Sequence, residues 1–237
     1  VKYTDKEGKL EYVWATSWGV STRLMGALIM CHSDDEGLVL PPRLAPIEVV
    51  AIPIYRSEEE LSARSERMLE LKKAFKERGI SFKYDDDDNR RPGWKFSEYE
   101  TKGVPVRLAM GPRDLANGKI EIARRDTKEK KIVDFDGVDT YVDLLLKEMQ
   151  SSLFQKALDF KNNSTKEVED FDSFKKAIKA GGFVSAHWDG SSETEDKIKE
   201  LTQATIRCIP LDQVKEDGKC VFSGNPSEGR VLFAKAY

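Results

Sequence analysis

The order of hydrophobic and polar residues at the start of the chain predicts a strand followed by a helix. The stretch EYVWATSW, residues 11–18, alternates as a half-buried strand does. Residues 21–30, STRLMGALIM, place apolar side chains at helical spacing, and Ser21 or Thr22 is suited to cap the first turn. The following LPPRLAP, residues 40–46, predicts an extended connector, because residues that precede proline avoid the helical region.

A strand–helix–strand pattern comes next. The run IEVVAIPIY, residues 47–55, is apolar throughout, which is typical of a strand buried on both faces of a parallel or mixed sheet. Residues 57–79 predict a helix with Ser57 as its N-cap and Gly79 at its end. Residues 80–86 predict a second strand, which completes a βαβ unit.

A polar loop, DDDDNRRPGW at residues 85–94, separates this unit from three further predicted elements. These are a helix over residues 95–102 and strands over 104–111 and 119–125. Together with the βαβ unit they form one α/β domain that ends near Asp136.

The last part of the chain alternates helices with strands. A long amphipathic helix over 138–163 is followed by shorter helices over 171–181 and 193–203, and by strand-like runs at 182–188, 204–211 and 229–237. The fold class predicted for the whole chain is therefore α/β: a mixed sheet with flanking helices, followed by a small α/β domain.

Composition narrows the possible functions. The 237 residues carry a formal net charge of −3, so any contact with nucleic acid depends on a local basic patch. The three cysteines, Cys31, Cys208 and Cys220, are widely spaced, which favours a reducing cytoplasm over a disulfide scaffold. Cys208 lies in a predicted strand, where it is expected to be a small core residue. No apolar run approaches the roughly 18 residues of a membrane helix.

Arg23 is the first candidate for chemistry. It stands at the start of a predicted helix, just after a Gly- and hydroxyl-rich turn. Helix N-termini and arginine both favour phosphate oxygens. A surface salt bridge is the alternative for the same residue.

Basic and aromatic residues alternate between the polar loop and the following strand. Cations bind phosphates and flat rings stack on unpaired bases, so this composition indicates a single-stranded RNA surface. A solvated charged face above core aromatics is the alternative. The run Asp85–Asp88 is interpreted as a solvated acidic cluster rather than a metal site. The set comprises Arg90, Arg91, Lys95, Lys102 and Arg107, interleaved with Trp94, Phe96 and Tyr99.

Three segments resemble one known family. TSWGVSTRLMGALIMCHSDDEGLVLPPRLAP, residues 16–46, resembles the third signature motif of class II aminoacyl-tRNA synthetases in its prolyl version. KFSEYETKGVPVRLAMGPRDL, residues 95–115, resembles the anticodon-binding domain of the same enzymes. The ending RVLFAKAY, residues 230–237, is similar to the tail of archaeal/eukaryotic-type prolyl-tRNA synthetases. The resemblance runs over essentially the whole chain.

The resemblance implies a division into four parts. Residues 1–45 correspond to a remnant of the catalytic domain that carries motif 3, and residues 46–136 to a class II anticodon-binding domain. Residues 137–162 correspond to a connecting helix, and residues 163–237 to the C-terminal domain.

It also implies an activity. The parent is expected to be a cytoplasmic, homodimeric proline–tRNA ligase that activates proline with ATP and Mg²⁺ and attaches it to tRNA(Pro), without a membrane partner. The other two signature motifs have no counterpart here, so we expect a C-terminal fragment that is inactive alone. A stand-alone RNA-binding module without catalysis and a generic α/β interaction domain are the alternatives. Retention of WGVSTR argues against both.

Site residues follow from the same resemblance. Arg23 corresponds to the arginine that contacts the ATP triphosphate, and Tyr237 to the tail residue whose carboxylate folds back toward the catalytic domain. A strand that simply ends is the alternative for Tyr237. Arg113 and Asp114 are expected to brace the end of the sheet. The proline and ATP pocket would be lined by Trp18, Gly19, Ser21 and Thr22. The anticodon guanines would be read by Lys95, Glu100, Lys102 and Arg107, with Arg90 and Arg91 clamping the backbone.

Many relatives bind zinc through four cysteines in the C-terminal domain. The corresponding positions here hold one thiolate, and His187 is a conceivable substitute nearby. Since Thr and Ser are poor zinc ligands, we expect no zinc, with ordinary packing in its place. The four positions are Asp189, Thr194, Cys220 and Ser223.

Overall fold

The computed structural model describes all residues except 56–57, 213–214 and 237. For residues 58–64 and 115 it describes only the helix to which they belong, so the Ser57 cap lies outside the described residues. The chain divides into two compact units, Val1–Gln150 and Ser151–Tyr237. The division falls inside the long helix α5 (Val138–Asn163). None of the described helices is long and apolar enough to cross a membrane.

A mixed sheet forms the centre of the first unit, as predicted, and it has five strands. β3, β4 and β5 run parallel, while β6 and β7 continue the sheet antiparallel, in the order β4-β3-β5-β6-β7. All five residues of β3 are buried, which is what a continuous apolar strand requires. The strands are β3 (Val49–Pro53), β4 (Phe82–Tyr84), β5 (Val106–Met110), β6 (Lys119–Arg124) and β7 (Lys130–Asp134).

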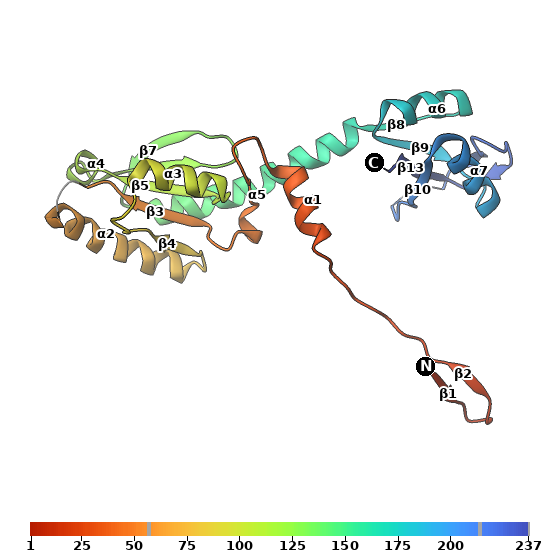
Figure 1. Ribbon diagram of the computed structural model, residues 1–237, viewed down its shortest axis with the longest axis horizontal. Helices are drawn as coiled ribbons and strands as arrows, with labels where there is room; N and C mark the ends of the chain where they lie inside the picture. Colours follow the sequence, from red (N-terminus) through yellow and green to blue (C-terminus); the bar gives the residue numbers. More distant parts are fainter. Residues whose placement is uncertain (56–57, 213–214, 237) are drawn as a thin grey trace. The chain divides into compact units, whose positions relative to one another are not determined.

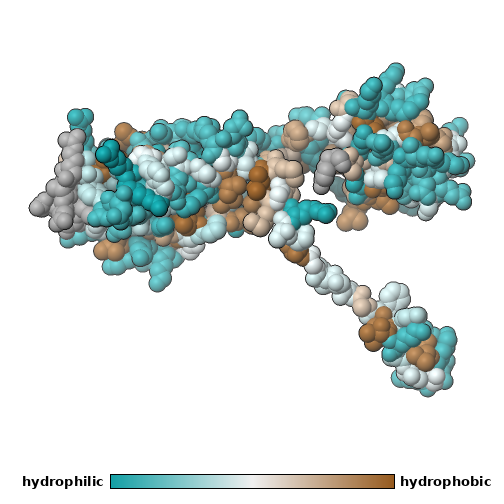
Figure 2. Space-filling model, viewed as in Figure 1, coloured by the Kyte–Doolittle hydropathy of each residue, from teal (hydrophilic) through white to brown (hydrophobic). Residues whose placement is uncertain are grey.

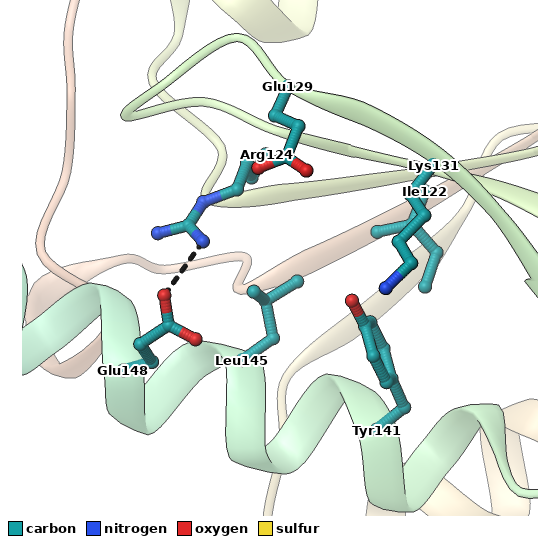
Figure 3. A pocket seen from close by; sticks show the side chains of 7 residues that line it. All are labelled: Ile122, Arg124, Glu129, Lys131, Tyr141, Leu145 and Glu148. Atoms are coloured by element: carbon teal, nitrogen blue, oxygen red, sulfur yellow. Dashed lines mark hydrogen bonds and ion pairs between the residues drawn. The ribbon is translucent and has the colours of Figure 1, made fainter.

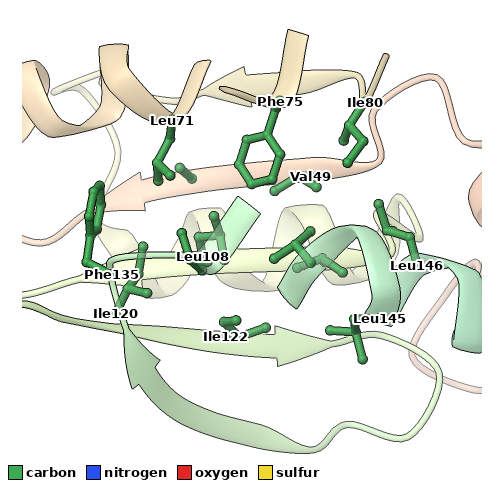
Figure 4. Packing of buried hydrophobic residues seen from close by; sticks show 14 of the residues in the cluster. Val49, Leu71, Phe75, Ile80, Leu108, Ile120, Ile122, Phe135, Leu145 and Leu146 are labelled. Atoms are coloured by element: carbon green, nitrogen blue, oxygen red, sulfur yellow. The ribbon is translucent and has the colours of Figure 1, made fainter. Parts of the chain in front are cut away.

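Helices cover both faces of this sheet (Figure 1). α2 (Glu58–Glu77) and α5 pack on one face, where Phe75, Leu108 and Leu146 belong to the main core cluster (Figure 4). α3 (Pro92–Thr101) packs on the other face, where Tyr99 joins Val50 and Ile52 of β3 in a smaller cluster. Because side chains alternate along a strand, β3 contributes to both clusters.

Two details of this unit differ from the predicted elements. α3 begins at Pro92 rather than Lys95, because proline is well suited to the first helical position. β7 was not predicted at all. It is an edge strand in which Lys130 and Lys131 are exposed and Ile132 is 62% exposed, so it shows no buried stripe in its sequence. A short helix, α4 (Pro112–Ala116), follows β5.

The N-terminal segment contains little regular structure. β1 (Lys2–Thr4) and β2 (Leu10–Tyr12) pair as a hairpin, and α1 (Arg23–His32) follows. The predicted strand over residues 11–18 is wrong beyond Tyr12, because the described part of the chain offers those residues no strand to pair with. Thr22 occupies the N-cap position, but its side chain makes no cap hydrogen bond. The connector holds one turn of 3-10 helix, Pro42–Leu44.

The second unit is a four-stranded sheet with two helices. Its order is β10-β13-β9-β8, and only β8 and β9 are parallel. Phe174 and Phe233 meet edge to face in the core, with ring centroids 5.1 Å apart. The elements are β8 (Thr165–Glu167), α6 (Phe171–Ala180), β9 (Phe183–His187), α7 (Ser192–Thr202), β10 (Ala204–Cys208), β11 (Gly218–Lys219), β12 (Pro226–Ser227) and β13 (Arg230–Lys235).

The expectation of a buried Cys208 is wrong. Its side chain is exposed at the end of β10. The pairing register with β13 shifts between Ile206 and Cys208, and such an irregularity re-aims the side chains that follow it.

Candidate nucleic-acid interface

Residues at four-residue spacing form an exposed ridge along α3. The Arg90 guanidinium lies over the Trp94 ring, 3.8 Å from its centroid, and its Nη1 lies 3.4 Å from a carboxylate oxygen of Glu98. Lys102 forms an ion pair with the other oxygen of Glu98. The side chains of Arg90 and Lys102 remain 50% and 58% exposed, and Trp94 remains 45% exposed. We call residues 90, 94, 98 and 102 the α3 ridge.

The ridge has the composition of a nucleic-acid contact. It offers two accessible cations for phosphate oxygens and one partly open ring. Glu98 orients both cations, so a phosphate must compete with its carboxylate. Arg91, the N-cap residue of α3, is exposed, and its main-chain oxygen accepts hydrogen bonds from the N–H groups of Trp94 and Lys95. Its guanidinium forms no ion pair with the described residues.

Lys95 lies on the inner side of α3, not on the surface. Its ammonium is 3.0 Å from Asp85 Oδ1, and its side chain is 3% exposed. The Tyr99 hydroxyl donates a hydrogen bond of 2.9 Å to Asp85 Oδ2. Burial opposes the negative charge of Asp85, but the bonds from Lys95 and Tyr99 outweigh it and hold the pKa of that carboxyl below its usual value. Burial and Asp85 raise the pKa of Tyr99. The ammonium of Lys95 is enclosed and already paired in this structure, so its contact with RNA stays a prediction that this geometry does not support.

Arg107 is also buried, but its environment is different. It projects from β5 toward α3, where its guanidinium stacks on Phe96 at 3.8 Å from the ring centroid. Nη2 lies 3.1 Å from Glu121 Oε1, yet none of the three guanidinium nitrogens has a partner in hydrogen-bonding geometry among the described residues. Buried donors are nearly always paired, so these nitrogens are available to an acceptor that enters the site.

Glu100 stands beside Arg107. Both line a small cavity of about 20 Å³, together with Tyr99, Arg124 and Arg125. Glu100 is half-buried near the end of α3, and its main-chain oxygen accepts a hydrogen bond of 2.9 Å from Arg125 Nε. The fold thus brings together an acceptor, Glu100, and a donor, Arg107, that are seven positions apart in the sequence. A cavity of this size holds a water molecule but not a nucleobase.

The two residues expected to brace the sheet end behave differently. Asp114 Oδ2 accepts a hydrogen bond of 2.9 Å from the Gly111 N–H, directly after β5, as a bracing residue would. Arg113 is exposed at the same end of the sheet and forms no ion pair with the described residues.

The segment expected to bind ATP and proline is open. Arg23 is the first residue of α1 and is exposed, and the first turn of that helix contains no acidic residue. A free guanidinium at a helix N-terminus is suited to polyphosphate oxygens, so the chemistry of Arg23 fits an ATP phosphate. The other expected pocket residues, Trp18, Gly19, Ser21 and Thr22, are all exposed, Trp18 by 92%.

Much of the N-terminal surface is apolar. Figure 2 shows hydrophobic residues in spots on the hairpin, while the extended chain that follows it is mostly of intermediate hydropathy. Patches of this kind usually mark a surface that another protein or another part of the chain covers. The most exposed include Tyr12 at 70%, Trp14 at 103%, Val20 at 84%, Met25 at 66% and Met30 at 78%.

In the C-terminal unit, three of the four zinc-equivalent positions meet. Asp189 Oδ2 accepts hydrogen bonds from Ser223 Oγ at 2.6 Å and Thr194 Oγ1 at 3.0 Å, and also from Asn225 at 3.2 Å. Cys220 is buried in the adjoining turn. Burial opposes the charge of Asp189, yet these bonds keep its pKa below the usual value. We call Asp189, Thr194, Ser223 and Asn225 the Asp189 cluster. Within the described residues, no three His, Cys, Asp or Glu side chains are placed to hold a metal.

A pocket of about 230 Å³ lies on the opposite face of the first sheet, between β6, β7 and α5 (Figure 3). Arg124 donates to both carboxylate oxygens of Asp126 at 2.8 and 2.9 Å, and to Glu148 at 2.9 Å. At the other end of the pocket the Lys131 ammonium lies 5.4 Å from the centroid of the Tyr141 ring. Because its arginine is saturated with carboxylates, this pocket offers little to an anionic ligand.

Sequence reasoning missed Glu98, Asp85 and Phe96 as organising residues. The spacing of residues 90, 94, 98 and 102 carried a signal for Glu98, since side chains four apart meet on one helix face. No local signal connects Asp85 with Lys95 or Phe96 with Arg107. Tyr237, the expected tail contact, lies outside the described residues.

Comparison with known families places two domain models on the chain. The model described as "Anticodon binding domain" matches residues 48–144, and the model described as "Prolyl-tRNA synthetase, C-terminal" matches residues 171–237. The proposed α3 ridge, Glu100 and Arg107 all fall within the first match.

Individual relatives match the whole chain. A proline–tRNA ligase from Christiangramia forsetii is 61% identical over 238 residues, and one from Porphyromonas gingivalis is 58% identical over 237 residues. Each alignment covers 100% of this chain and 48% of the relative, so the chain spans about half the length of those relatives. Among solved structures, prolyl-tRNA synthetase from Cryptosporidium parvum complexed with L-proline and AMP matches with a TM-score of 0.87 and 34% identity, over 100% of this chain and 50% of that one.

Proposed function

The chain belongs to the prolyl-tRNA synthetase family, and on that premise we propose that it supplies tRNA recognition to an enzyme that activates proline with ATP and attaches it to tRNA(Pro). The identity to proline–tRNA ligases extends over all of the chain, including residues before the anticodon-binding match at 48–144. A stand-alone anticodon-domain module would have no need of that preceding segment, so the synthetase is favoured.

The observation that supports the proposal is the buried guanidinium of Arg107, which lines the same cavity as Glu100 and has no partner in hydrogen-bonding geometry among the described residues, although its Nη2 lies 3.1 Å from Glu121. Arginine donates to O6 and N7 of guanine, and a carboxylate accepts from the N1 and N2 groups of the same base. The proline anticodon contains guanines, which is the base that this pair suits. Since the cavity holds only a water molecule, base reading by Arg107 requires a change of rotamer at its mouth.

The α3 ridge supports the same function at the level of the RNA backbone. We infer that Arg90 and Arg91 bind phosphates, that the exposed ammonium of Lys102 contacts the anticodon, and that Trp94 offers a ring to an unstacked base. Lys95 supports the surface from below by holding Asp85.

We further infer that Arg23 binds the triphosphate of ATP, and that Trp18, Gly19, Ser21 and Thr22 line the proline and ATP pocket. Magnesium would accompany the ATP and neutralise its phosphates. The exposed apolar side chains of residues 12–30 support this inference, because they need a covering surface that completes the pocket. The complete enzyme would act in the cytoplasm as a homodimer.

A binding titration tests the proposed function. This chain is titrated with tRNA(Pro) and with the same transcript in which both anticodon guanines are replaced by cytosine, each at several salt concentrations. We expect tighter binding to the native transcript at every salt concentration. Equal binding to both transcripts that disappears together with rising salt would reduce the interaction to phosphate attraction and refute anticodon recognition.

A further inference from the structure

Arg125 connects the segment after α1 to the end of α3. Its Nη1 and Nη2 donate to the two carboxylate oxygens of Asp34 at 2.8 and 2.6 Å, and its Nε donates to the main-chain oxygen of Glu100 at 2.9 Å. The Arg125 side chain is only 2% exposed. A guanidinium is planar and rigid, so a displacement of Asp34 or of the Glu100 main chain also displaces the other.

We call the bonds from Arg125 to Asp34 and Glu100 the Arg125 clamp. The backbone segments beside it, residues 37–40 and 101–103, are in close contact. The Leu38 N–H donates to the Thr101 oxygen at 3.0 Å, and the Leu40 N–H donates to the Gly103 oxygen at 3.3 Å. A Cβ on Gly103 would lie 2.6 Å from the Leu38 Cβ, and one on Gly37 would lie 2.6 Å from the Thr101 Cα. Residues 34–40 therefore follow any movement of residues 100–103.

The same segment holds the end of α1. The Ser33 N–H closes the helix on the Ile29 oxygen at 3.0 Å, and the Asp34 N–H bonds the Gly37 oxygen at 3.1 Å. None of the ten residues of α1, all of which the structure describes, is buried. A helix of ten residues is a stiff rod about 15 Å long, so what holds its C-terminal end also sets the placement of Arg23 at its start.

We propose that Arg125 is a positioning residue that couples anticodon reading at Glu100 to the placement of α1 and Arg23. This inference rests on the proposed function, because it takes Glu100 as a reader of the anticodon. A base that binds the Glu100 side chain displaces the main chain of the same residue. Arg125 is bonded to that main chain and to Asp34, so it displaces Asp34 as well. The hydrogen bonds from Arg125 also hold the pKa of Asp34 well below its usual value, so the pair stays charged at neutral pH.

Hydrogen–deuterium exchange on the chain tests the coupling. Exchange at residues 24–40 is measured for the free chain, with tRNA(Pro), and with the transcript whose anticodon guanines are replaced. We expect the native anticodon alone to slow exchange across residues 33–40 several-fold. Arg125→Lys should lose this protection, because lysine cannot bridge Asp34 and Glu100 at once.

Lys128 provides the matched control. Its ammonium lies 3.6 Å from Asp34 and 2.7 Å from Glu36, and among the described residues it forms no ion pair with Glu100. Lys128→Gln should therefore keep the anticodon-dependent protection. Asp34→Asn removes the clamp from its other side without deleting a buried cation, and it should lose the protection as Arg125→Lys does.

Two results would overturn the inference, and they are distinguishable. If the parent separates the two anticodons in binding, but Asp34→Asn and Arg125→Lys retain full protection at residues 33–40, the clamp does not couple the two sites. If the parent binds both transcripts equally, the proposed function fails and the coupling fails with it.

Discussion

The ammonium of Lys95 lies 3.0 Å from a carboxylate oxygen of Asp85 and donates to the main-chain oxygen of the same residue at 3.0 Å. The two residues are ten positions apart and fasten the start of the acidic loop to the inner side of α3. With Lys95 only 3% exposed, this is an internal ion pair whose hydrogen-bonding groups are satisfied. It fixes the helix on which the exposed α3 ridge is built.

Loss of this pair should destabilise the first unit. Lys95→Met leaves the Asp85 carboxylate partly buried without its cation, and breaking a buried pair on one side costs about 3 kcal/mol or more. Lys102→Met, at the C-cap of the same helix, removes an exposed cation and should cost less than about 1 kcal/mol. Urea unfolding of both variants measures the difference. Equal losses would show that Lys95 is not a structural cation.

Acid should weaken the fold through Asp34 and Asp85. Hydrogen bonds from Arg125 lower the pKa of Asp34, and bonds from Lys95 and Tyr99 outweigh burial at Asp85. A carboxyl whose pKa is lower in the folded state stabilises the protein above its unfolded pKa, near 4, and loses that contribution as the pH falls toward the folded pKa. The free energy of unfolding should thus decline steadily below about pH 4.

The Asp34→Asn variant isolates one contribution to this decline. It should be less stable than the parent at neutral pH and show a shallower decline in acid, as measured by urea unfolding at a series of pH values. Asp35→Asn, which changes the exposed neighbouring residue, should reproduce the parent curve. A parent-like slope in Asp34→Asn would contradict the assignment.

The Asp189 cluster should carry a measurable part of the stability of the second unit. Its carboxylate accepts bonds from Thr194, Ser223 and Asn225, and hydrogen bonds to a charged group contribute about 1.5–3 kcal/mol each. We expect Asp189→Ala to lose at least about 2 kcal/mol. Exposed Asp196, also in this unit, is the control, and Asp196→Ala should stay within about 0.5 kcal/mol. Urea unfolding and hydrogen exchange over residues 183–235 measure the stability of both variants. Equal losses of stability in Asp189→Ala and Asp196→Ala would refute the role of the cluster.

The basic residues at the start of α3 should contribute affinity without selectivity. Arg90→Gln and Arg91→Gln should each weaken binding of native and substituted anticodons alike, and each should reduce the slope of log affinity against log salt by about 1. Lys147→Gln, on α5 across the sheet, should leave the slope unchanged. A loss confined to the native anticodon would instead place base reading on these arginines.

Regular apolar patterns made most of the fold predictable. The run around β3 is continuous because both faces of that strand are covered, and the stripe of α2 ends at Gly79 because the chain turns there with a φ of +74°. The lysine-rich edge strand β7 has no apolar pattern that would predict it. The alternating pattern after Tyr12 predicted a strand that is not formed, because alternation predicts a strand only where a neighbouring strand can pair with it.

The candidate site was predictable by region and only partly by residue. Basic and aromatic residues in the sequence pointed to α3 and β5, but the sequence does not show whether a charged side chain is buried or exposed. Lys95 and Arg107 are buried because Asp85, Phe96 and Glu121 reach them from other elements. The cluster around Asp189 likewise depends on a turn that approaches from beyond Cys220, where we expected ordinary packing alone.

The most direct test of the account is a double-mutant cycle, in which Arg107 is changed in the protein and a guanine is changed in the anticodon. The dissociation constants of the parent and of Arg107→Ala are measured for tRNA(Pro) and for transcripts with either anticodon guanine replaced by adenine, at one salt concentration, after circular dichroism shows that the variant is folded. The account predicts that the parent prefers guanine at one position by about 1–3 kcal/mol, and that Arg107→Ala loses that preference while binding the substituted transcript as the parent does. A folded Arg107→Ala that keeps the full preference for both guanines would contradict it.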